Sequence, residues 1–385
     1  MASKPALLEF FAGGGLAGLG LSGTFKPVFA NDIDPMKCAT YRANFPDVRL
    51  AEGDIWKLRA EDLPKADLAW ASFPCQDLSL AGARRGLNAP RSGAFWGFWN
   101  LMEGLKSAGR PVQTLVLENV CGLMSSHRGR DFAALLGELG EAGYRVGALV
   151  LDANHFTAQS RPRLFVVAHL GRIPEALVAD GPDPILHPPT LRTAVDALPH
   201  ETRLAWVWWK TPPLPRRNAD LLSVVEASPA ADVWFDDAGA ARMLAQMSPL
   251  HRERLEAAQA GGGRRVGAVY RRIRTENGEK VQRAEVRYDG LAGCLRTPAG
   301  GSSRQFLAVS ERGKTRFRPL LSREAARLMG CPESYVLPAR ETAALKVLGD
   351  GVCVPAVRWL GQALLAPLAG VRGEGAAGNP VDAAA

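Results

Sequence analysis

The sequence of 385 residues is poor in cysteine and has no uninterrupted apolar run long enough to cross a bilayer, and both shortages exclude classes of protein. Its six cysteines are scattered, without a CxxC pair or a neighbouring histidine ladder, which argues against a zinc site and against a disulfide framework. The first residues contain one early lysine and a short apolar segment, as expected of a first strand and not of a signal peptide. We therefore expect no metal, no membrane association and a reducing, cytoplasmic environment.

The net charge of +8 is concentrated in one part of the chain. Residues 251–320 contain 16 lysines and arginines but only 7 acidic residues, so the remainder is close to neutral. An even spread would indicate an ordinary solvated surface, whereas a local basic excess favours a surface that binds phosphates. The charge distribution thus favours a partner that carries phosphate groups.

Apolar strand patterns alternate with helical patterns between residues 6 and 170, which predicts an α/β fold with a doubly wound, mostly parallel sheet. Asp34 and Pro35 are a suitable N-cap and first-turn pair for one of the helices. The expected strands are 7–11, 28–31, 68–72, 114–117, 146–151 and 164–168, and the expected helices are 16–21, 35–44, 95–105 and 131–142.

The pattern of the sequence changes after residue 171. Nine prolines up to residue 215 interrupt the alternation of strand and helix patterns. The basic region that follows, with short β-like runs between about 216 and 318, predicts a second, smaller, loop-rich domain, and helices are expected again at 322–329 and 355–368. We therefore divide the chain into a first domain (1–171), a linker with the second domain (172–318), C-terminal helices that return to the first domain (319–369) and a disordered tail (370–385).

A glycine-rich segment follows the first predicted strand. Residues 13–18 fit the GxGxxG motif between a strand and a helix, and Asp32 ends the next strand about 20 residues on, where an acid can bind a ribose. Asp54, in Gly53-Asp54-Ile55, could bond an adenine amino group. The pattern predicts a nucleotide-like cofactor, but it does not separate a dinucleotide from S-adenosylmethionine.

A cysteine follows the apolar strand at 68–72. Pro74 cannot continue a central strand, so Cys75 is expected at the carboxyl end of the sheet, in front of a long polar segment. A free cysteine is often simply a buried small side chain. At the ligand-binding edge of an α/β sheet it can also be a nucleophile.

Taken together, these motifs resemble, in their order, the C5-cytosine DNA methyltransferases. The resemblance covers residues 5–170 and 318–368, and the region between them corresponds to the variable target-recognition domain of that family. The motifs are Phe11-Ala12-Gly13-Gly14-Gly15, Asp32, Asp54, Phe73-Pro74-Cys75-Gln76, Glu118-Asn119-Val120, Gln159-Ser160-Arg161-Pro162-Arg163, Arg323-Glu324-Ala325-Ala326-Arg327-Leu328-Met329-Gly330 and Gly349-Asp350-Gly351-Val352.

The resemblance implies methyl transfer from S-adenosylmethionine to C5 of a cytosine that is flipped out of duplex DNA. C5 is a poor nucleophile until a thiolate adds at C6, and this role falls to Cys75. Glu118 is expected to bond or protonate N3 of the ring. Arg161 and Arg163 match the arginine pair of the family, with Arg163 expected at O2 of the base.

The family pattern also suggests cofactor-binding residues. Ile33 stands where the family often has an aromatic residue that stacks on the adenine, and Asp350 stands where many members have asparagine. The expected cofactor-binding residues are Phe11, Gly13, Gly15, Asp32, Ile33, Asp54, Ile55, Pro74, Asp350 and Val352.

DNA contacts are expected from the segment 76–93 and from the basic region. Cys294-Leu295 replaces the Thr-Leu pair that is usual in the family, so we hypothesise that Thr297 takes over a phosphate contact. The expected DNA-binding residues are Gln76, Ser79, Arg91, Arg271, Arg272, Arg274, Arg296, Thr297, Gly300, Gly301 and Arg304.

Three alternatives remain at this stage. A tRNA cytosine methyltransferase shares the scaffold but lacks a recognition domain this large and basic. An NAD-dependent oxidoreductase would explain only the glycine motif and Asp32, and a non-catalytic DNA-binding relic would not need the full set of reactive residues. We expect a monomer that acts on double-stranded DNA at the nucleoid, and whether a cognate restriction endonuclease accompanies it is left open.

Overall fold

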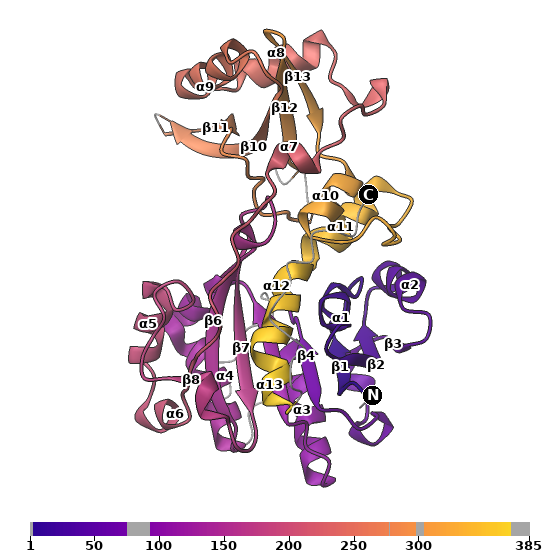
Figure 1. The fold of residues 1–385 in the computed structure, drawn as a ribbon, viewed down its shortest axis with the longest axis vertical. Helices are drawn as coiled ribbons and strands as arrows, with labels where there is room; N and C mark the ends of the chain where they lie inside the picture. The colour runs from indigo at the N-terminus through magenta and orange to yellow at the C-terminus, as the bar shows by residue number, and fades with distance from the viewer. Residues whose placement is uncertain (1–2, 75–92, 277, 298–303, 371–385) are drawn as a thin grey trace.

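The computed structural model describes residues 3–74, 93–276, 278–297 and 304–370, and it contains a large sheet in one lobe and a smaller sheet in another (Figure 1). The large sheet has seven strands in the order β3-β2-β1-β4-β5-β7-β6, and only β7 runs antiparallel to its neighbours. This confirms the predicted doubly wound, mostly parallel sheet. Its strands are β1 (Ala6–Phe10), β2 (Lys26–Asp32), β3 (Arg49–Glu52), β4 (Leu68–Ala71), β5 (Thr114–Asn119), β6 (Arg145–Asp152) and β7 (Pro162–His169).

Both faces of the large sheet are covered, which explains why its central strands are apolar throughout. Every residue of β4 and β5 is buried, as expected of parallel strands between two helical layers. Leu68 and Trp70 pack in the core with the first and the last helices of the chain, whereas Ala69 and Ala71 pack in the opposite core. The helices of this lobe are α1 (Leu16–Leu21), α2 (Pro35–Asn44), α3 (Ala94–Ser107) and α4 (Arg130–Glu141).

The cap predicted for α2 is present, because the Asp34 side chain accepts hydrogen bonds from the backbone N–H groups of Met36 and Lys37. Short 3-10 turns connect several elements of the chain. They are Ile55–Lys57, Ala60–Asp62, Cys121–Gly129, Ala153–His155, Glu175–Leu177 and Ala231–Val233.

The proline-rich stretch lies along the edge strand β6 of the large sheet (Figure 1). The backbone N–H of Val150 donates to Leu186 O (2.8 Å), and that of Val207 donates to Val146 O (2.8 Å). The first part of the predicted 172–318 unit therefore packs on the first lobe. Its elements are β8 (Val178–Ala179), α5 (Pro189–Asp196), α6 (His200–Leu204) and β9 (Trp208–Trp209).

The second sheet is antiparallel, in the order β11-β10-β12-β13, and the short β-like runs expected here prove to include a strand of 12 residues. Met243, Leu255 and Val269 belong to the small apolar core between this sheet and its helices. The elements of this lobe are α7 (Leu221–Val224), α8 (Asp237–Ala245), α9 (Pro249–Ala260), β10 (Arg265–Glu276), β11 (Glu279–Arg287), β12 (Phe306–Glu311) and β13 (Lys314–Pro319).

The C-terminal helices return to the large sheet, as the sequence predicts. Gly20 on α1 lies so close to α12 that an added Cβ would be 2.8 Å from Val357. The helices are α10 (Ser322–Leu328), α11 (Glu341–Asp350), which the sequence analysis did not predict, α12 (Val354–Leu360), a π-helical turn (Gly361–Leu365) and α13 (Ala366–Leu368).

The region Glu341–Leu368 is long and apolar enough to cross a membrane by length and composition, contrary to the expectation that no stretch would be. Some 67% of its most apolar window is buried inside the protein, which is what the core helix of a soluble protein also shows.

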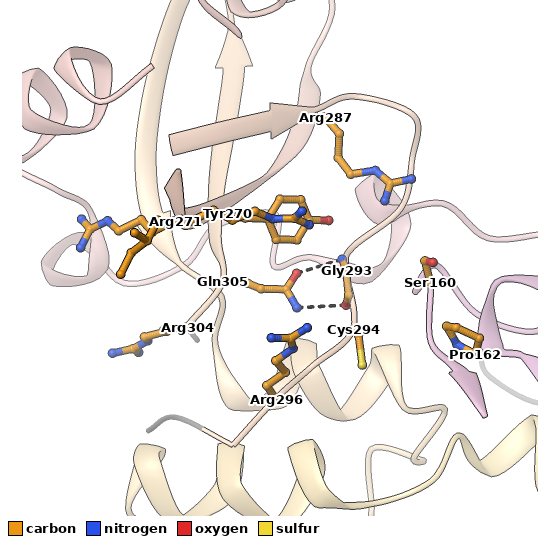
Figure 2. Close-up of a pocket in the computed structure, with 12 residues that line it drawn as sticks. Ser160, Pro162, Tyr270, Arg271, Arg287, Gly293, Cys294, Arg296, Arg304 and Gln305 are labelled. Carbon is orange, nitrogen blue, oxygen red and sulfur yellow. Dashed lines mark hydrogen bonds between the residues drawn. The ribbon is translucent and has the colours of Figure 1, made fainter. Parts of the chain in front are cut away.

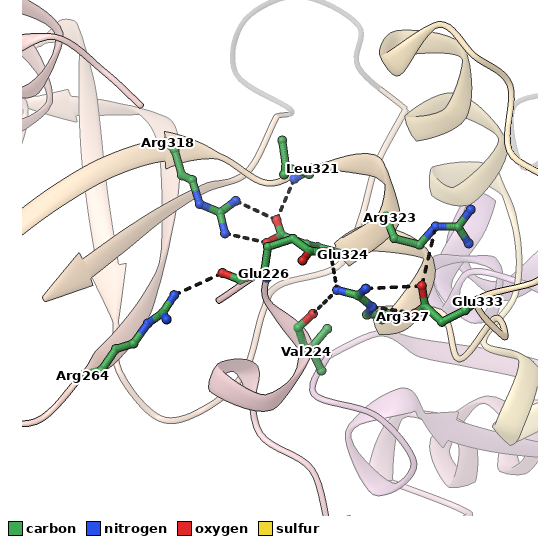
Figure 3. Close-up of polar contacts among 9 residues, drawn as sticks. All are labelled: Val224, Glu226, Arg264, Arg318, Leu321, Arg323, Glu324, Arg327 and Glu333. Carbon is green, nitrogen blue, oxygen red and sulfur yellow. Dashed lines mark hydrogen bonds and ion pairs between the residues drawn. The ribbon is translucent and has the colours of Figure 1, made fainter. Parts of the chain in front are cut away.

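A network of buried charges joins the small sheet to α10 (Figure 3). The Arg318 guanidinium binds both carboxylate oxygens of Glu324 at 2.5 and 2.8 Å, and both side chains are fully buried. Glu324 also accepts the backbone N–H of Glu226, whose own carboxylate binds Arg327 at 2.8 Å. Removal of one partner of the Arg318–Glu324 pair would leave a buried charge unpaired, at a cost of about 3 to 5 kcal/mol.

Candidate active site

A cavity of about 500 Å³ opens at the carboxyl ends of β1, β2, β4 and β5, where ligands bind in open α/β sheets. Segments far apart in the sequence meet there, including the glycine-rich segment, the end of β5 and the segment 349–352. The predicted site residues among its lining are Phe11, Gly13, Asp32, Ile33, Pro74, Glu118, Arg161, Arg163, Asp350 and Val352.

Glu118 lies near the end of β5, only 6% exposed, with its Oε1 atom 3.2 Å from Nε of Arg163. Burial raises the pKa of Glu118, and the charges of Arg163 and Arg161 and a hydrogen bond from Ser72 oppose that rise. A carboxyl group in this position can bond to a ring nitrogen or donate a proton to it. Arg163 fixes its orientation.

The chain that leaves β4 is held against β5. The Asn119 side-chain amide donates to Phe73 O (3.0 Å), two residues before Cys75. Pro74 lines the cavity. Six predicted site residues lie outside the described residues, so their positions stay predictions: Cys75, Gln76, Ser79, Arg91, Gly300 and Gly301.

The two arginines of the predicted pair have different surroundings. Arg161 is 2% exposed and its guanidinium is engaged by main-chain carbonyls: Nη1 donates to Leu295 O (2.6 Å), and Nη2 donates to the carbonyls of Gly349 (2.9 Å) and Gly351 (2.6 Å). Its Nη1 also lies 3.2 Å from the Cys294 sulfur. Arg161 therefore joins two distant loops, whereas Arg163 contacts the Glu118 carboxylate.

The glycine-rich segment is anchored by Asp32. One carboxylate oxygen of Asp32 accepts the Gly13 N–H (2.8 Å) and the other accepts the Asp34 N–H (2.9 Å). Gly13 and Gly15 have φ of 58° and 82°, in the left-handed region that favours glycine. Gly15 lies behind the cavity, because a Cβ there would be 2.4 Å from the Phe45 ring.

The residues predicted to bind adenine are not all brought together. Ile33 is 66% exposed and lines the cavity. The Asp54 side chain accepts the Trp56 N–H (3.1 Å) at the start of a 3-10 turn, and Ile55 is buried against Gly97. Neither Asp54 nor Ile55 lines the cavity, so only Ile33 of these three faces it.

Asp350 is held from two sides. Its carboxylate binds Nζ of Lys37 (2.7 Å) and accepts a hydrogen bond from the Thr297 hydroxyl. The Thr297 hydroxyl thus donates to Asp350. This contact speaks against the hypothesis that Thr297 binds a DNA phosphate. Lys37 lines the same cavity and was not predicted, because a lysine in the first turn of a helix resembles any solvated residue.

Glu9 is a wall residue that the sequence analysis also missed. It is fully buried on β1, where it accepts the Gly18 N–H (3.0 Å) and the Tyr41 hydroxyl (3.2 Å). Burial raises its pKa to about 7. An acid inside the apolar run of residues 6–11 was the signal that could have identified it.

A second cavity, of about 620 Å³, adjoins the first and is called here the basic cavity (Figure 2). The two cavities share no lining residue, but two residues of the basic cavity lie beside the arginine pair that lines the first: Pro162, which stands between the two arginines, and Cys294, whose sulfur is 3.2 Å from Nη1 of Arg161. Five arginines and no acidic residue line it, and four of them were predicted to bind DNA. Its lining comprises Ser160, Pro162, Tyr270, Arg271, Arg272, Ile273, Arg287, Gly293, Cys294, Arg296, Arg304 and Gln305.

Arg274, also predicted to bind DNA, does not line the basic cavity and instead pairs with Glu285. Arg287 was not predicted, because it stands in the part of the basic region where acids and bases alternate.

The model of the C-5 cytosine-specific DNA methylase family matches residues 6–366. The chain belongs to this family. It is 27% identical over 369 residues to the Type II methyltransferase M.NlaX of Neisseria lactamica, covering 95% of this chain and 97% of that protein. It is 26% identical to the Type II methyltransferase M1.ScrFI of Lactococcus lactis subsp. cremoris, covering 94% and 78%.

The fold of this methylase is also similar to that of the S. pombe Dnmt2 methyltransferase, with a TM-score of 0.61 at 16% identity over 95% of this chain and 98% of that one. Family membership identifies the methylase as a DNA (cytosine-5-)-methyltransferase and confirms the resemblance. The oxidoreductase alternative, which rested on the glycine motif and Asp32, is wrong.

Proposed function

We propose that the protein transfers a methyl group from S-adenosylmethionine to C5 of a flipped-out cytosine in duplex DNA, through a covalent bond between Cys75 and C6. The observation that carries the proposal is the buried Glu118–Arg163 pair in the cavity that also contains the glycine-rich segment. A nucleotide-like cofactor and a planar base would meet in this one space. The segment that follows β4 is held at Phe73 and lines the cavity at Pro74, the residue before Cys75 in the sequence.

The residues of the cavity fit the cofactor. An added Cβ on Gly13 would meet nothing within 4 Å, so the backbone leaves room for close approach. The carboxylate of Asp32 retains lone pairs for a ribose hydroxyl, since each of its oxygens accepts one N–H. The exposed Ile33 offers an apolar surface to the adenine. Bound S-adenosylmethionine supplies the methyl group.

The chain's own groups perform the remaining chemistry. The Cys75 thiolate forms a bond to C6, and the ring electrons shift toward N3, which Glu118 protonates or bonds. Arg163 holds Glu118 and is placed to bind O2 of the base. After C5 has gained its methyl group, it loses its proton, and the electrons of that C–H bond re-form the ring double bond as Cys75 leaves.

DNA would occupy the basic cavity. Its five arginines supply charge for the phosphate backbone and donors for base edges, and Pro162 and Cys294 in its lining lie beside the arginine pair of the Glu118 cavity. A cytosine that leaves a duplex in the basic cavity would therefore move only a short distance to reach Glu118. Relatives named Type II methyltransferases favour a role beside a cognate restriction endonuclease, and we infer that the enzyme acts as a monomer.

The test is methyl transfer to unmodified duplex DNA of mixed sequence, with digestion of the product to nucleosides. The proposal expects 5-methylcytosine from the wild type and none from Cys75→Ser. Cys121→Ser is the matched control and should remain active. A wild type that binds DNA but yields no 5-methylcytosine would be a non-catalytic relic, and transfer to tRNA alone would favour the RNA alternative.

A further inference from the structure

The segment 292–297 crosses between the lobes, and hydrogen bonds hold each of its residues except Arg296. At its start, the Ala292 N–H donates to Ala158 O (2.8 Å), and the Ala292 carbonyl accepts the Ser160 N–H (2.9 Å). The Gln305 side chain then makes two hydrogen bonds of 2.9 Å to the backbone of Gly293 (Figure 2). A β-bridge to Gln159 thus holds the first residue of the segment, and a side chain holds the second.

The second half of the segment is held from the other side. The Leu295 N–H donates to Oε1 of Gln159 (3.0 Å), and Leu295 O accepts the Arg161 guanidinium. The backbone of Arg296 lies so close to Gly349 that a Cβ there would be 2.6 Å from the carbonyl carbon of Arg296. The Thr297 hydroxyl is bound to Asp350. The backbone that carries Arg296 is therefore preorganised.

The guanidinium of Arg296 is exposed and points into the basic cavity (Figure 2). Within the described part of the chain it forms no hydrogen bond and no ion pair with an acid. The other arginines of this cavity are engaged: Arg271 over the Phe306 ring, Arg272 with Glu285, Arg287 with Asp289 and Arg304 with Glu341.

We propose that Arg296 is the specificity-determining residue that reads a guanine close to the target cytosine. The inference rests on the proposed function. A free guanidinium on a fixed backbone suits the two acceptors O6 and N7 of guanine, and arginine to guanine is the commonest specific contact in the major groove. A flexible arginine paired with an acid suits the phosphates, which carry no sequence information.

The position of the guanine follows from the spacing. Arg296 is two residues from Cys294, whose sulfur lies 3.9 Å from the Arg163 guanidinium nitrogens. Two extended residues span at most about 7 Å. Because successive bases on one strand are about 3.4 Å apart, the guanine lies within a few base pairs of the flipped cytosine.

The experiment uses the full chain and a pool of duplexes with randomised sequence. The bound fraction is sequenced after selection, and the methylated cytosines of a second pool are mapped with their flanking bases. The variants are Arg296→Ala and Arg296→Lys, with Arg272→Ala as the matched control for an arginine held by an acid. Binding to a single duplex is also measured as a function of salt.

For Arg296→Ala, one flanking position is expected to lose its preference for guanine by about 10- to 100-fold, with preferences elsewhere retained. Arg296→Lys should lose part of it, because an ammonium cannot form the two-pronged contact. Arg272→Ala should weaken all sequences equally and lower the salt slope by about one.

Uniform weakening by Arg296→Ala, with a lower salt slope and an unchanged sequence preference, would make Arg296 a phosphate contact and overturn the inference. The inference would also be overturned if the wild type and Arg296→Ala selected the same bases at every position of the bound DNA. Failure of the proposed function has a different signature. In that case the wild type methylates no cytosine, while the bound pool still shows the guanine that Arg296 selects.

Discussion

The two cavities beside the arginine pair differ in their chemistry. The first is lined by glycines, apolar side chains, five acids and three cations: Glu9, Asp32, Asp34, Glu118 and Asp350, with Lys37, Arg161 and Arg163. The basic cavity has five arginines and no acid. The first therefore suits a cationic cofactor and a base that is protonated during the reaction, and the second suits a polyanion. A wall only a few residues thick separates them.

The largest effect is expected from Glu118→Gln in the first cavity. The amide keeps the shape and a hydrogen-bond donor but cannot transfer a proton to the base. Turnover should fall by about 10²- to 10⁴-fold, with little change in DNA affinity. Steady-state methylation and equilibrium binding check this together. Glu103→Gln, on the exposed face of α3, is the control, and a Glu118→Gln enzyme of full activity would contradict the assigned role.

Glu9→Gln tests whether the acidic cavity stores a buried proton. The folded-state pKa of Glu9, about 7, lies above its ordinary value of 4.5. Between these values the folded state binds more protons than the unfolded state, so its contribution to stability is full below pH 4.5 and is lost as pH rises through about 7. The loss amounts to about 3 kcal/mol over this window.

Urea unfolding at pH 5 and pH 8 measures this dependence. Glu9→Gln should flatten the fall in the free energy of unfolding, whereas Glu103→Gln should not. An unchanged pH dependence in Glu9→Gln would show that this carboxyl group is not the source.

Replacement of Arg161 and Arg163 by lysine should distinguish a structural role of Arg161 from a role of Arg163 in the reaction. Arg161→Lys keeps the charge but loses hydrogen bonds to three carbonyls, so it should destabilise the fold by about 2 to 3 kcal/mol. Arg163→Lys should lower turnover with much less effect on stability. Unfolding curves and methylation rates for both variants distinguish these roles, and equal destabilisation by the two would remove the distinction.

The smallest effect is expected at the rim of the first cavity. Ile33→Trp places an aromatic ring where an exposed aliphatic side chain now stands, and should tighten cofactor binding by about 1 kcal/mol, or fivefold. Calorimetric titration with S-adenosylhomocysteine measures it. Leu204→Trp, on the exposed surface of α6, is the control, and tighter binding in both variants would point to a nonspecific gain.

The sequence predicted the first lobe more fully than the second because its signals are local. Fully buried strands such as β4 must be apolar, and Asp34-Pro35 marks the start of a helix at any place in a chain. The hairpin of β10 and β11 was predicted only as short runs. Its outer half is exposed on both faces and alternates charges, so no apolar period marks it.

The residues of the candidate site also differ in how far the sequence predicts them. Glu118 stands near the end of β5 and contacts Arg163, two residues that the resemblance had named. The contacts of Arg161 with Gly349, 188 residues away, and of Thr297 with Asp350 depend on how the lobes pack. No local sequence pattern indicates such contacts, so only the structure shows that Arg161 joins two distant loops.

The central claim of the proposed function is that Cys75 bonds to C6 of the target cytosine. Duplex DNA that contains 5-fluorocytosine tests it most directly, because fluorine cannot leave as a proton and the adduct is trapped after methyl transfer. Incubation with S-adenosylmethionine, followed by denaturation and peptide mapping by mass spectrometry, should give a DNA adduct on Cys75. No adduct with the wild type across varied target sequences, or an adduct that persists in Cys75→Ser, would contradict the account.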